Sequence, residues 1–256
     1  MSRRLTQRGK ERRAQLLSYA TRRFAEDGYH PTSVADIVDG LGVGKGVFYW
    51  YFDSKEELFI EILRSAQNDM RRTQQRRIDG VTDPVERIQL GLRAAVTWMA
   101  EHDDERRLFE FARTEPAFNS AMRSGQRVLV KDAVDHLVEA IEAGRIPDRD
   151  PEVLAHAILG VANHLSRVYI GSRGQDPAAV ADMVVSFCME GIGAGTRAEG
   201  AVTSPAYLAI RLRNRRRTVR SNRVGALTFS LSRMSDCDPT ISSTRVTGLA
   251  RRTMSG

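Results

Sequence analysis

The sequence contains few cysteines, and this shortage limits the kinds of site that it can hold. Its two cysteines, Cys188 and Cys237, cannot form a disulfide framework and lack the spacing of metal ligands. Cys188 stands in the apolar run 183–189, where a buried and unreactive thiol is the simpler interpretation. We therefore expect a protein of the reducing cytoplasm that binds no metal ion and no other cofactor.

Long hydrophobic runs are also missing. No segment approaches the ~20 uncharged apolar residues that a membrane-spanning helix needs. The basic residues 1–10 are not followed by the apolar core of a secretory signal. Hydrophobic residues make up 41% of the chain and charged residues 28%, which is typical of a globular protein. The sequence thus predicts one large or two modest domains and no membrane segment.

The net charge of +7 comes from one end of the chain. Residues 201–256 contain eleven arginines and two acidic residues, a net charge of +9, so the preceding 200 residues carry −2. Overall basicity is therefore no argument for nucleic-acid binding. Residues 1–24, by contrast, hold eight Lys or Arg residues against Glu11 alone. A local excess of this kind suits contact with a phosphate backbone.

Apolar residues recur at helical spacing along most of the chain, and no alternating pattern predicts a strand. Prolines, glycines and capping side chains mark where the helices begin and end. We expect about nine helices, hence an all-α fold. The first three span 9–27, 33–40 and 44–51, three more start at Ser54, Pro84 and Asp104, one covers 130–141, and two start at Pro151 and Pro177.

The composition changes after residue 197. Residues 198–256 are rich in Arg, Ser and Thr and show no sustained periodicity, so we expect this tail to be disordered. It could serve as a second, nonspecific nucleic-acid arm. A solvated tail without such a role is the interpretation that the composition favours.

The second and third predicted helices are short and joined by a glycine-bearing turn, which is the pattern of a helix-turn-helix motif. Apolar residues such as Ile37 and Phe48 can hold the two helices together. A lysine at the start of the second helix can meet phosphate or guanine edges, and tyrosines can donate hydrogen bonds to phosphates. The residues that we expect to bind DNA are Thr32, Ser33, Gly44, Lys45, Gly46, Tyr49, Trp50, Tyr51 and Lys55.

Three of these positions leave questions open. Gly44 and Gly46 each cost a helix about 0.5–1 kcal/mol relative to Ala, so we expect a recognition helix that gains order when it meets DNA. Trp50 could pack on sugar and phosphate or stack on the neighbouring helix. The sequence does not favour one of these over the other.

The stretch from Phe24 to Phe59 resembles the DNA-binding domain of the TetR family of one-component regulators. The resemblance combines residue type with spacing at Phe24, Gly28-Tyr29, Thr32-Ser33, Ile37, Gly42-Val43, Lys45, Tyr49-Trp50-Tyr51-Phe52 and Ser54-Lys55-Glu56-Glu57-Leu58. It implies a helix-turn-helix domain at 1–53, a helical ligand-binding and dimerisation domain at 54–197, and the tail at 198–256. It also implies a homodimeric repressor that binds a palindromic double-stranded operator and releases it when a small-molecule inducer binds.

The same resemblance places an inducer pocket and a dimer interface in the second domain. Regular apolar stripes in the last two predicted helices expose more apolar surface than one monomer easily buries, although ordinary intramolecular core is the alternative. The candidate pocket residues are Trp98, Phe109, Phe111, Met122 and His136, and core is the simpler interpretation for each. The candidate interface residues are Leu154, Ile158, Val161, Leu165, Val180, Val184 and Phe187.

Two other classes of function fit less well. The glycine-rich residues 40–46 resemble a phosphate-binding loop, but Asp39 and Gly46 stand where that loop needs Gly and Ser or Thr. Neither the acidic residues 101–105 nor the histidines show metal-site spacing, so an enzyme is a weak alternative. An all-α interaction module is the second alternative, and it has no need of Lys45 or Tyr49.

Overall fold

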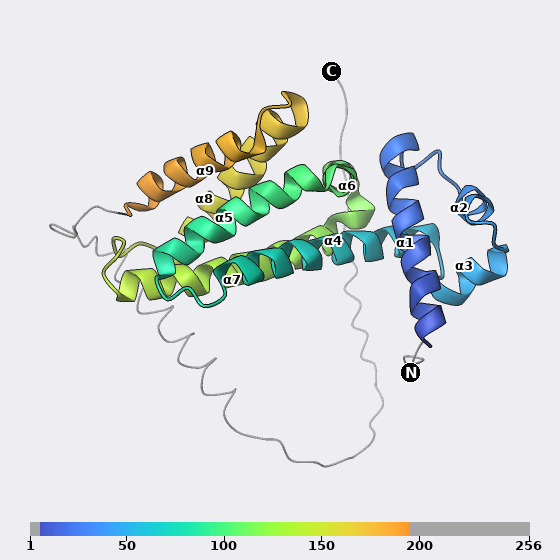
Figure 1. The fold of residues 1–256 in the computed structure, drawn as a ribbon, viewed down its shortest axis with the longest axis horizontal. Coiled ribbons are helices and arrows are strands. Elements are labelled where there is room, and N and C mark those ends of the chain that lie inside the picture. Colours follow the sequence, from blue (N-terminus) through green and yellow to red (C-terminus); the bar gives the residue numbers. More distant parts are fainter. Residues whose placement is uncertain (1–5, 195–256) are drawn as a thin grey trace, which may run out of the picture. The chain divides into compact units, whose positions relative to one another are not determined.

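The computed structural model describes residues 6–194, and this part of the chain forms nine α-helices and no strand (Figure 1). The all-α prediction is therefore confirmed. The predicted tail at 198–256 and Cys237 lie outside the described residues. The helices are α1 (Gln7–Asp27), α2 (Val34–Gly40), α3 (Lys45–Tyr51), α4 (Lys55–Ile78), α5 (Pro84–Glu101), α6 (Asp103–Thr114), α7 (Asn119–Glu142), α8 (Pro151–Leu165) and α9 (Pro177–Ile192), with a 3₁₀ turn η1 (Pro116–Phe118) and a π-helical segment η2 (Ser166–Ser172).

Local side-chain contacts determine where most of these helices begin. Ser33 and Asp36 form a reciprocal capping box at α2, in which the Ser33 Oγ accepts from the Asp36 N–H at 3.2 Å. The hydrogen bonds from Ser33 hold the pKa of the Asp36 carboxyl below its usual value. Ser54 caps α4 in the same position, and α5, α8 and α9 each start with an Asp cap followed by Pro. These signals are local, so the sequence predicted these starts correctly.

Two segments differ from the sequence prediction. Helix α7 begins at Asn119, well before the predicted start near 130. The sequence prediction missed its first eleven residues because only Ala121 is buried among them and no apolar stripe marks them. Helix α8 passes at Ser166 into the π-helical segment η2. Such a widening inserts an extra residue per turn and leaves no clear signal in apolar spacing.

The buried side chains form two clusters. The first joins α1–α4 with α6 and η1 and includes Phe24, Ile37 and Phe59. The second lies among α5, α7, α8 and α9. Helix α5 also supplies Trp98 to the first cluster. Figure 1 shows α4 leaving the α1–α3 group and running beside α5 and α7, which it contacts. Helix α4 therefore connects the first three helices to the rest of the bundle, and α1 also contacts α6 directly.

Two further features of residues 6–194 concern membranes and metals. None of their helices combines the length and the hydropathy that crossing a bilayer requires. Among the same residues, no cluster of three or more His, Cys, Asp or Glu side chains could hold a metal ion. Cys188 is buried, and burial raises the pKa of its thiol to about 11, so the thiol stays protonated at neutral pH.

Candidate nucleic-acid interface and ligand cavity

Helix α3 is held on the α1–α2 pair by buried aromatic side chains. Phe48 is fully buried and Phe52 nearly so, and both belong to the first core cluster. The turn before α3 is closed by the Val43 N–H, which donates to the Val38 carbonyl at 2.9 Å. Gly42 within this turn has φ of +64°, a conformation that L side chains rarely adopt. The predicted helix at 44–51 and its glycine turn are therefore confirmed.

The outer side of α3 carries large, exposed side chains. Tyr49 is 55% exposed and Trp50 is 51% exposed, and residues 6–194 otherwise expose few large apolar groups. Lys45 is exposed beside them, as are Gly44 and Gly46. No ion pair involving Lys45 occurs within residues 6–194, so its ammonium is available to a partner.

Trp50 and Tyr51 differ in their surroundings. Their rings meet edge to face, with centroids 4.5 Å apart. Tyr51 is half-buried and packs against the first core cluster, whereas Trp50 retains about half of its surface. The ring contact of Trp50 thus lies within α3, and packing on a sugar or phosphate stays a prediction, for which about half of the side chain is exposed.

The side-chain hydroxyls of Thr32 and Ser33 form hydrogen bonds within the fold. Thr32 is buried, and its hydroxyl donates to the Gly28 carbonyl at 2.8 Å. That burial runs against the expectation that the Thr32 side chain faces DNA: it closes the loop between α1 and α2 instead. Ser33 is exposed, but its hydroxyl serves as the cap of α2.

Lys55 points inward at the start of α4. Its Nζ donates to the carbonyls of Tyr29 at 3.0 Å and Thr32 at 3.1 Å, and it lies 4.3 Å from the centre of the Tyr29 ring. Three contacts of this kind occupy most of the donors of one ammonium group. In this structure Lys55 therefore positions the α1–α2 loop, a role that the sequence pattern did not indicate.

The first turns of α1 also carry exposed basic residues. Arg8 and Lys10 are exposed, and neither has an ion pair within the described residues. Arg13 pairs with Glu61 at 2.9 Å and lies over the Phe52 ring, which joins α1 to α4. The positive charge that the sequence places near the helix-turn-helix is thus accessible along α1.

An aromatic cluster joins the helix-turn-helix to the rest of the bundle. Tyr29 contacts the rings of Phe59, Phe111 and Phe118, with centroids 4.9–5.4 Å apart. Phe111 was predicted as a pocket residue, but it belongs to this cluster because its side of α6 faces α1. The cluster couples the loop after α1 to α4, α6 and η1 by direct packing.

A cavity of about 390 Å³ lies among α4–α8 and η2, and its volume is within the range of small-molecule sites. Two of the predicted pocket residues, Phe109 and Met122, line it. The remaining lining residues come from six segments that are far apart in sequence: Gln67, Met70, Met99, Arg113, Asn119, Arg123, Gln126, Leu129, His156, Leu159, Gly160, Asn163, His164 and Arg167.

The other predicted pocket residues lie elsewhere, so the prediction of one shared pocket needs correction. His136 lines a separate cavity of about 210 Å³ between α4, α5 and α7. Trp98 stacks on His102 and donates its Nε1–H to Asp69 at 2.9 Å, on the side of α5 that faces away from α8. Sequence reasoning also missed Arg113 and Arg167; the signal for Arg113 is its position four residues after Phe109, on the same face of α6.

Most of the residues predicted for a dimer interface are buried or half-buried within this chain. Leu154, Ile158, Val180 and Val184 are buried in this chain's own second core cluster, and Val161 and Leu165 are half-buried against it. The intramolecular alternative therefore describes these residues. Of the seven, Phe187 alone is strongly exposed, at 60%. The exposed apolar face consists of Val153, Ala157, Gly160, Met183 and Phe187.

Comparison with known proteins gives two matches that together cover most of the described residues. A sequence model of bacterial regulatory proteins of the tetR family matches residues 16–62, which span the helix-turn-helix. A model of the tetracyclin repressor-like C-terminal domain matches residues 81–192.

Individual relatives agree with these matches. The chain is 34% identical to the transcriptional repressor KstR2 of Mycobacterium tuberculosis over 153 residues, which cover 56% of this chain and 74% of the relative. It is 32% identical to the transcriptional regulator HbdR of an Aromatoleum species over 134 residues, 52% of this chain and 55% of HbdR. A crystal structure of a TetR-family regulator from Syntrophomonas wolfei superposes with a TM-score of 0.64 at 22% identity, covering 72% of this chain and 96% of that one, which supports the fold.

Proposed function

The chain belongs to the TetR family and is a helix-turn-helix transcriptional regulator, and we propose that it is a homodimeric repressor whose α3 helices bind a palindromic operator until a small molecule releases it. The observation that carries the proposal is the outer side of α3. Lys45, Tyr49 and Trp50 are exposed there above the fully buried Phe48.

In the proposed complex α3 lies in a major groove. Lys45 reaches a phosphate or a guanine edge, and Tyr49 and Trp50 contact the sugar-phosphate backbone. Gly44 and Gly46 allow the backbone of α3 to approach the DNA closely, since no Cβ stands out from either position. Tyr51 and Ser33 border this surface, while Thr32 and Lys55 support it from within.

Dimerisation follows from the exposed apolar face of α8 and α9. Val153 is 63% exposed and Phe187 60%, and the exposed small residues Ala157 and Gly160 of α8 permit close approach of a second copy. A twofold axis through this face would present two α3 helices, as half-sites about 34–36 Å apart require. The proposal includes a helix-turn-helix domain that ends at residue 53, a second domain that ends at residue 197, and a cytoplasmic location.

Ligand release uses the cavity of about 390 Å³ and helix α4. Gln67 and Met70 of α4 line the cavity, and Phe59 of the same helix packs on Tyr29 in the helix-turn-helix. A ligand that shifts α4 therefore moves the helix-turn-helix that packs on it, and so changes the spacing of the two α3 helices in the dimer. The ligand must bind the DNA-incompetent arrangement more tightly, because equal affinity for both shifts nothing. Repression as the direction of control is supported by the name of the relative KstR2.

Selection of genomic fragments by the purified full-length chain tests this proposal. We expect enrichment of fragments that share one inverted repeat, retained at 50 mM salt and lost steeply as salt rises. Fragments without a shared sequence would contradict a specific operator. Fragments that carry a single, unrepeated half-site would contradict the dimer.

A further inference from the structure

The cavity of about 390 Å³ is electrostatically one-sided. Arg113, Arg123 and Arg167 line it, together with His156 and His164, and no lining residue is Asp or Glu. The side-chain amides of Gln67, Asn119, Gln126 and Asn163 supply further hydrogen-bond donors. A polar ligand group in this cavity would therefore meet positive charge and N–H donors without a competing carboxylate.

The remaining lining residues are apolar. Met70, Met99 and Phe109 contribute from α4, α5 and α6, and Met122, Leu129 and Leu159 from α7 and α8. Methionine side chains adapt their shape to an irregular apolar partner. The cavity lining thus combines basic and amide side chains that suit an anionic group with apolar side chains that suit a hydrocarbon.

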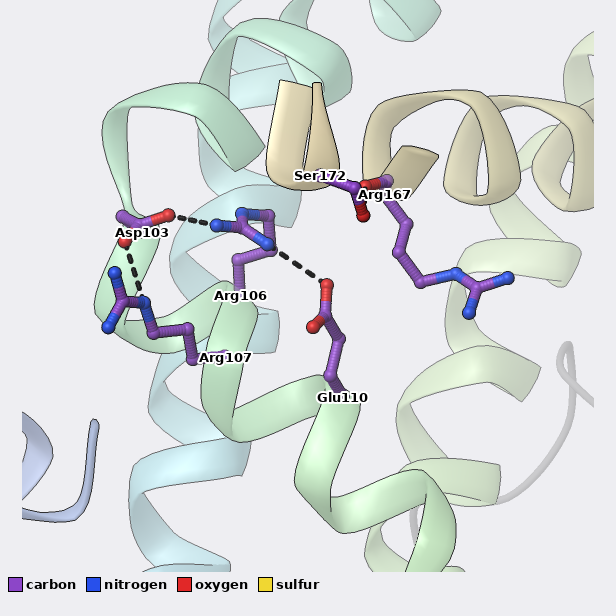
Figure 2. Close-up of polar contacts among 6 residues, drawn as sticks. All are labelled: Asp103, Arg106, Arg107, Glu110, Arg167 and Ser172. Carbon is purple, nitrogen blue, oxygen red and sulfur yellow. Dashed lines mark hydrogen bonds and ion pairs between the residues drawn. The ribbon is translucent and has the colours of Figure 1, made fainter. Parts of the chain in front are cut away.

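Glu110, the acidic side chain that acts on the charge of Arg113, is already occupied. Glu110 accepts a hydrogen bond from the Arg106 Nη1 at 3.0 Å, and Asp103 binds the other end of the same guanidinium. Figure 2 shows Glu110 turned toward Arg106, while Arg167 extends away from this group with no interaction drawn to it. Arg106 is 7% exposed and packs so closely on η2 that a Cβ at Gly171 would overlap its guanidinium.

The arginines of the cavity consequently form no ion pair with a described carboxylate. No ion pair of Arg113, Arg123 or Arg167 exists within residues 6–194, and the hydrogen-bond partner of Arg167 is the Nδ1 of His164 at 3.1 Å. Burial and the neighbouring Arg167 lower the pKa of Arg113, which Glu110 only partly offsets. Guanidinium groups remain protonated at neutral pH, so the three arginines keep their positive charge there.

The second cavity of the bundle provides an internal comparison. It also holds two arginines, Arg71 and Arg87, but each has a carboxylate partner. Arg71 Nη2 donates to Asp132 at 3.1 Å, and Arg87 pairs with Glu139. Among the described residues, carboxylates thus neutralise the arginines of one cavity, and the arginines of the other have no ion-pair partner.

We infer that the cavity of about 390 Å³ binds an amphiphile with an anionic head, either a carboxylate or a phosphate monoester, whose head is held by Arg113 and Arg167 and whose hydrocarbon tail lies against Met70, Met99 and Phe109. A planar guanidinium can donate two parallel hydrogen bonds to either head group. Arg106 acts as a positioning residue, because it keeps Glu110 away from Arg113. This inference deepens the proposed function, in which the same cavity receives the releasing ligand.

Isothermal titration of the full chain with three ten-carbon probes tests the inference: decanoate, decyl phosphate and decanol. We expect at least one of the two anions to bind at least tenfold more tightly than decanol. Binding of one anion alone supports the inference and assigns the head group. Equal affinity for decanol and the anions, or binding of neither anion, overturns it.

Arginine variants locate the head group. We expect Arg113→Gln and Arg167→Gln each to weaken anion binding about tenfold and to leave decanol binding unchanged, since only the charge contact is lost. Arg113→Lys keeps the charge but loses the paired donors, so its affinity should lie between those of the wild type and Arg113→Gln, and such a value shows that the loss in Arg113→Gln is not misfolding. Arg107→Gln is the matched control, because Arg107 is an exposed arginine of the same helix that binds Asp103 at 2.8 Å. Unchanged anion binding in both glutamine variants overturns the inference.

Operator affinity, measured separately by fluorescence anisotropy, distinguishes this inference from the proposed function. Charge-dependent anion binding without any effect on operator affinity would leave the anion site standing and contradict ligand release through this cavity. Operator binding that is intact in a chain that takes up neither anion would contradict the anion site and leave the DNA-binding part of the proposal standing.

Discussion

The Nζ of Lys55 lies 3.0 Å from the carbonyl oxygen of Tyr29 and 4.3 Å from the centre of its ring. One ammonium group thus ties the start of α4 to the loop that follows α1. The Tyr29 ring in turn packs on Phe59 and Phe118, so this contact lies between the helix-turn-helix and the rest of the helical bundle.

Replacing Lys55 should therefore change stability more than it changes phosphate contact. We expect Lys55→Met to lower the free energy of unfolding by about 1–2 kcal/mol, because the charged donor to two carbonyls is lost. The salt dependence of operator binding should keep its slope, since a lost phosphate contact reduces that slope by about 1. Urea unfolding and a salt titration measure the two effects. A reduced slope with unchanged stability would show that Lys55 binds DNA directly.

Gly46 offers a direct probe of order in α3. A Cβ there would meet no atom within 4 Å, and the residue lies inside the helix, so Gly46→Ala should stabilise α3 by about 0.5–1 kcal/mol. We expect slower amide hydrogen exchange across α3 in the free protein. Gly42→Ala is the contrasting variant: its φ of +64° should make alanine destabilising by about 1 kcal/mol. Unchanged exchange in Gly46→Ala would remove the idea that the glycines loosen this helix.

The exposed face of α8 and α9 predicts which substitutions separate the dimer. Val153→Asp and Phe187→Asp should each shift the chain toward monomer in light scattering after size exclusion, because a desolvated charge opposes an apolar interface. Val128→Asp is the control, since Val128 is an exposed valine on α7, away from this face. A dimer that survives both interface substitutions and dissociates with the control would place the interface elsewhere.

Gly171 tests how Arg106 is positioned. Gly171→Ala places a methyl group against the Arg106 guanidinium, which should cost about 1 kcal/mol of stability and displace Arg106 from Glu110. The freed Glu110 then neutralises Arg113, so decanoate binding should weaken. Gly91→Ala is the control, because nothing lies within 4 Å of that position in α5. Calorimetry that finds decanoate affinity unchanged in Gly171→Ala would contradict this role of Arg106.

The sequence predicted the helix order and most helix starts because those depend on neighbouring residues. Ser33, Ser54 and the three Asp-Pro starts act within one turn of the chain. It also predicted which side of α3 is exposed, because the buried Phe48 and Phe52 leave little freedom for Tyr49 and Trp50.

The faces of α8 and α9 were harder to predict, since both helices carry apolar residues on more than one side. Periodicity alone could not show that Leu154 is buried and Val153 exposed. The cavity was beyond sequence reasoning for another reason. Its lining comes from six segments, and the pairing of Glu110 with Arg106, which leaves Arg113 uncompensated, depends on tertiary packing.

The central claim is that the exposed side of α3 reads the operator. Fluorescence anisotropy with a selected operator, comparing the wild-type chain with the double variant Lys45→Ala/Tyr49→Ala, tests it most directly. Lys131→Ala serves as control, because Lys131 is an exposed lysine on α7 that binds Asp135 at 3.1 Å. We predict at least a hundredfold loss of operator affinity in the double variant, with the melting temperature and dimer mass unchanged, and no loss in the control. Operator affinity that is the same in all three proteins would contradict the claim.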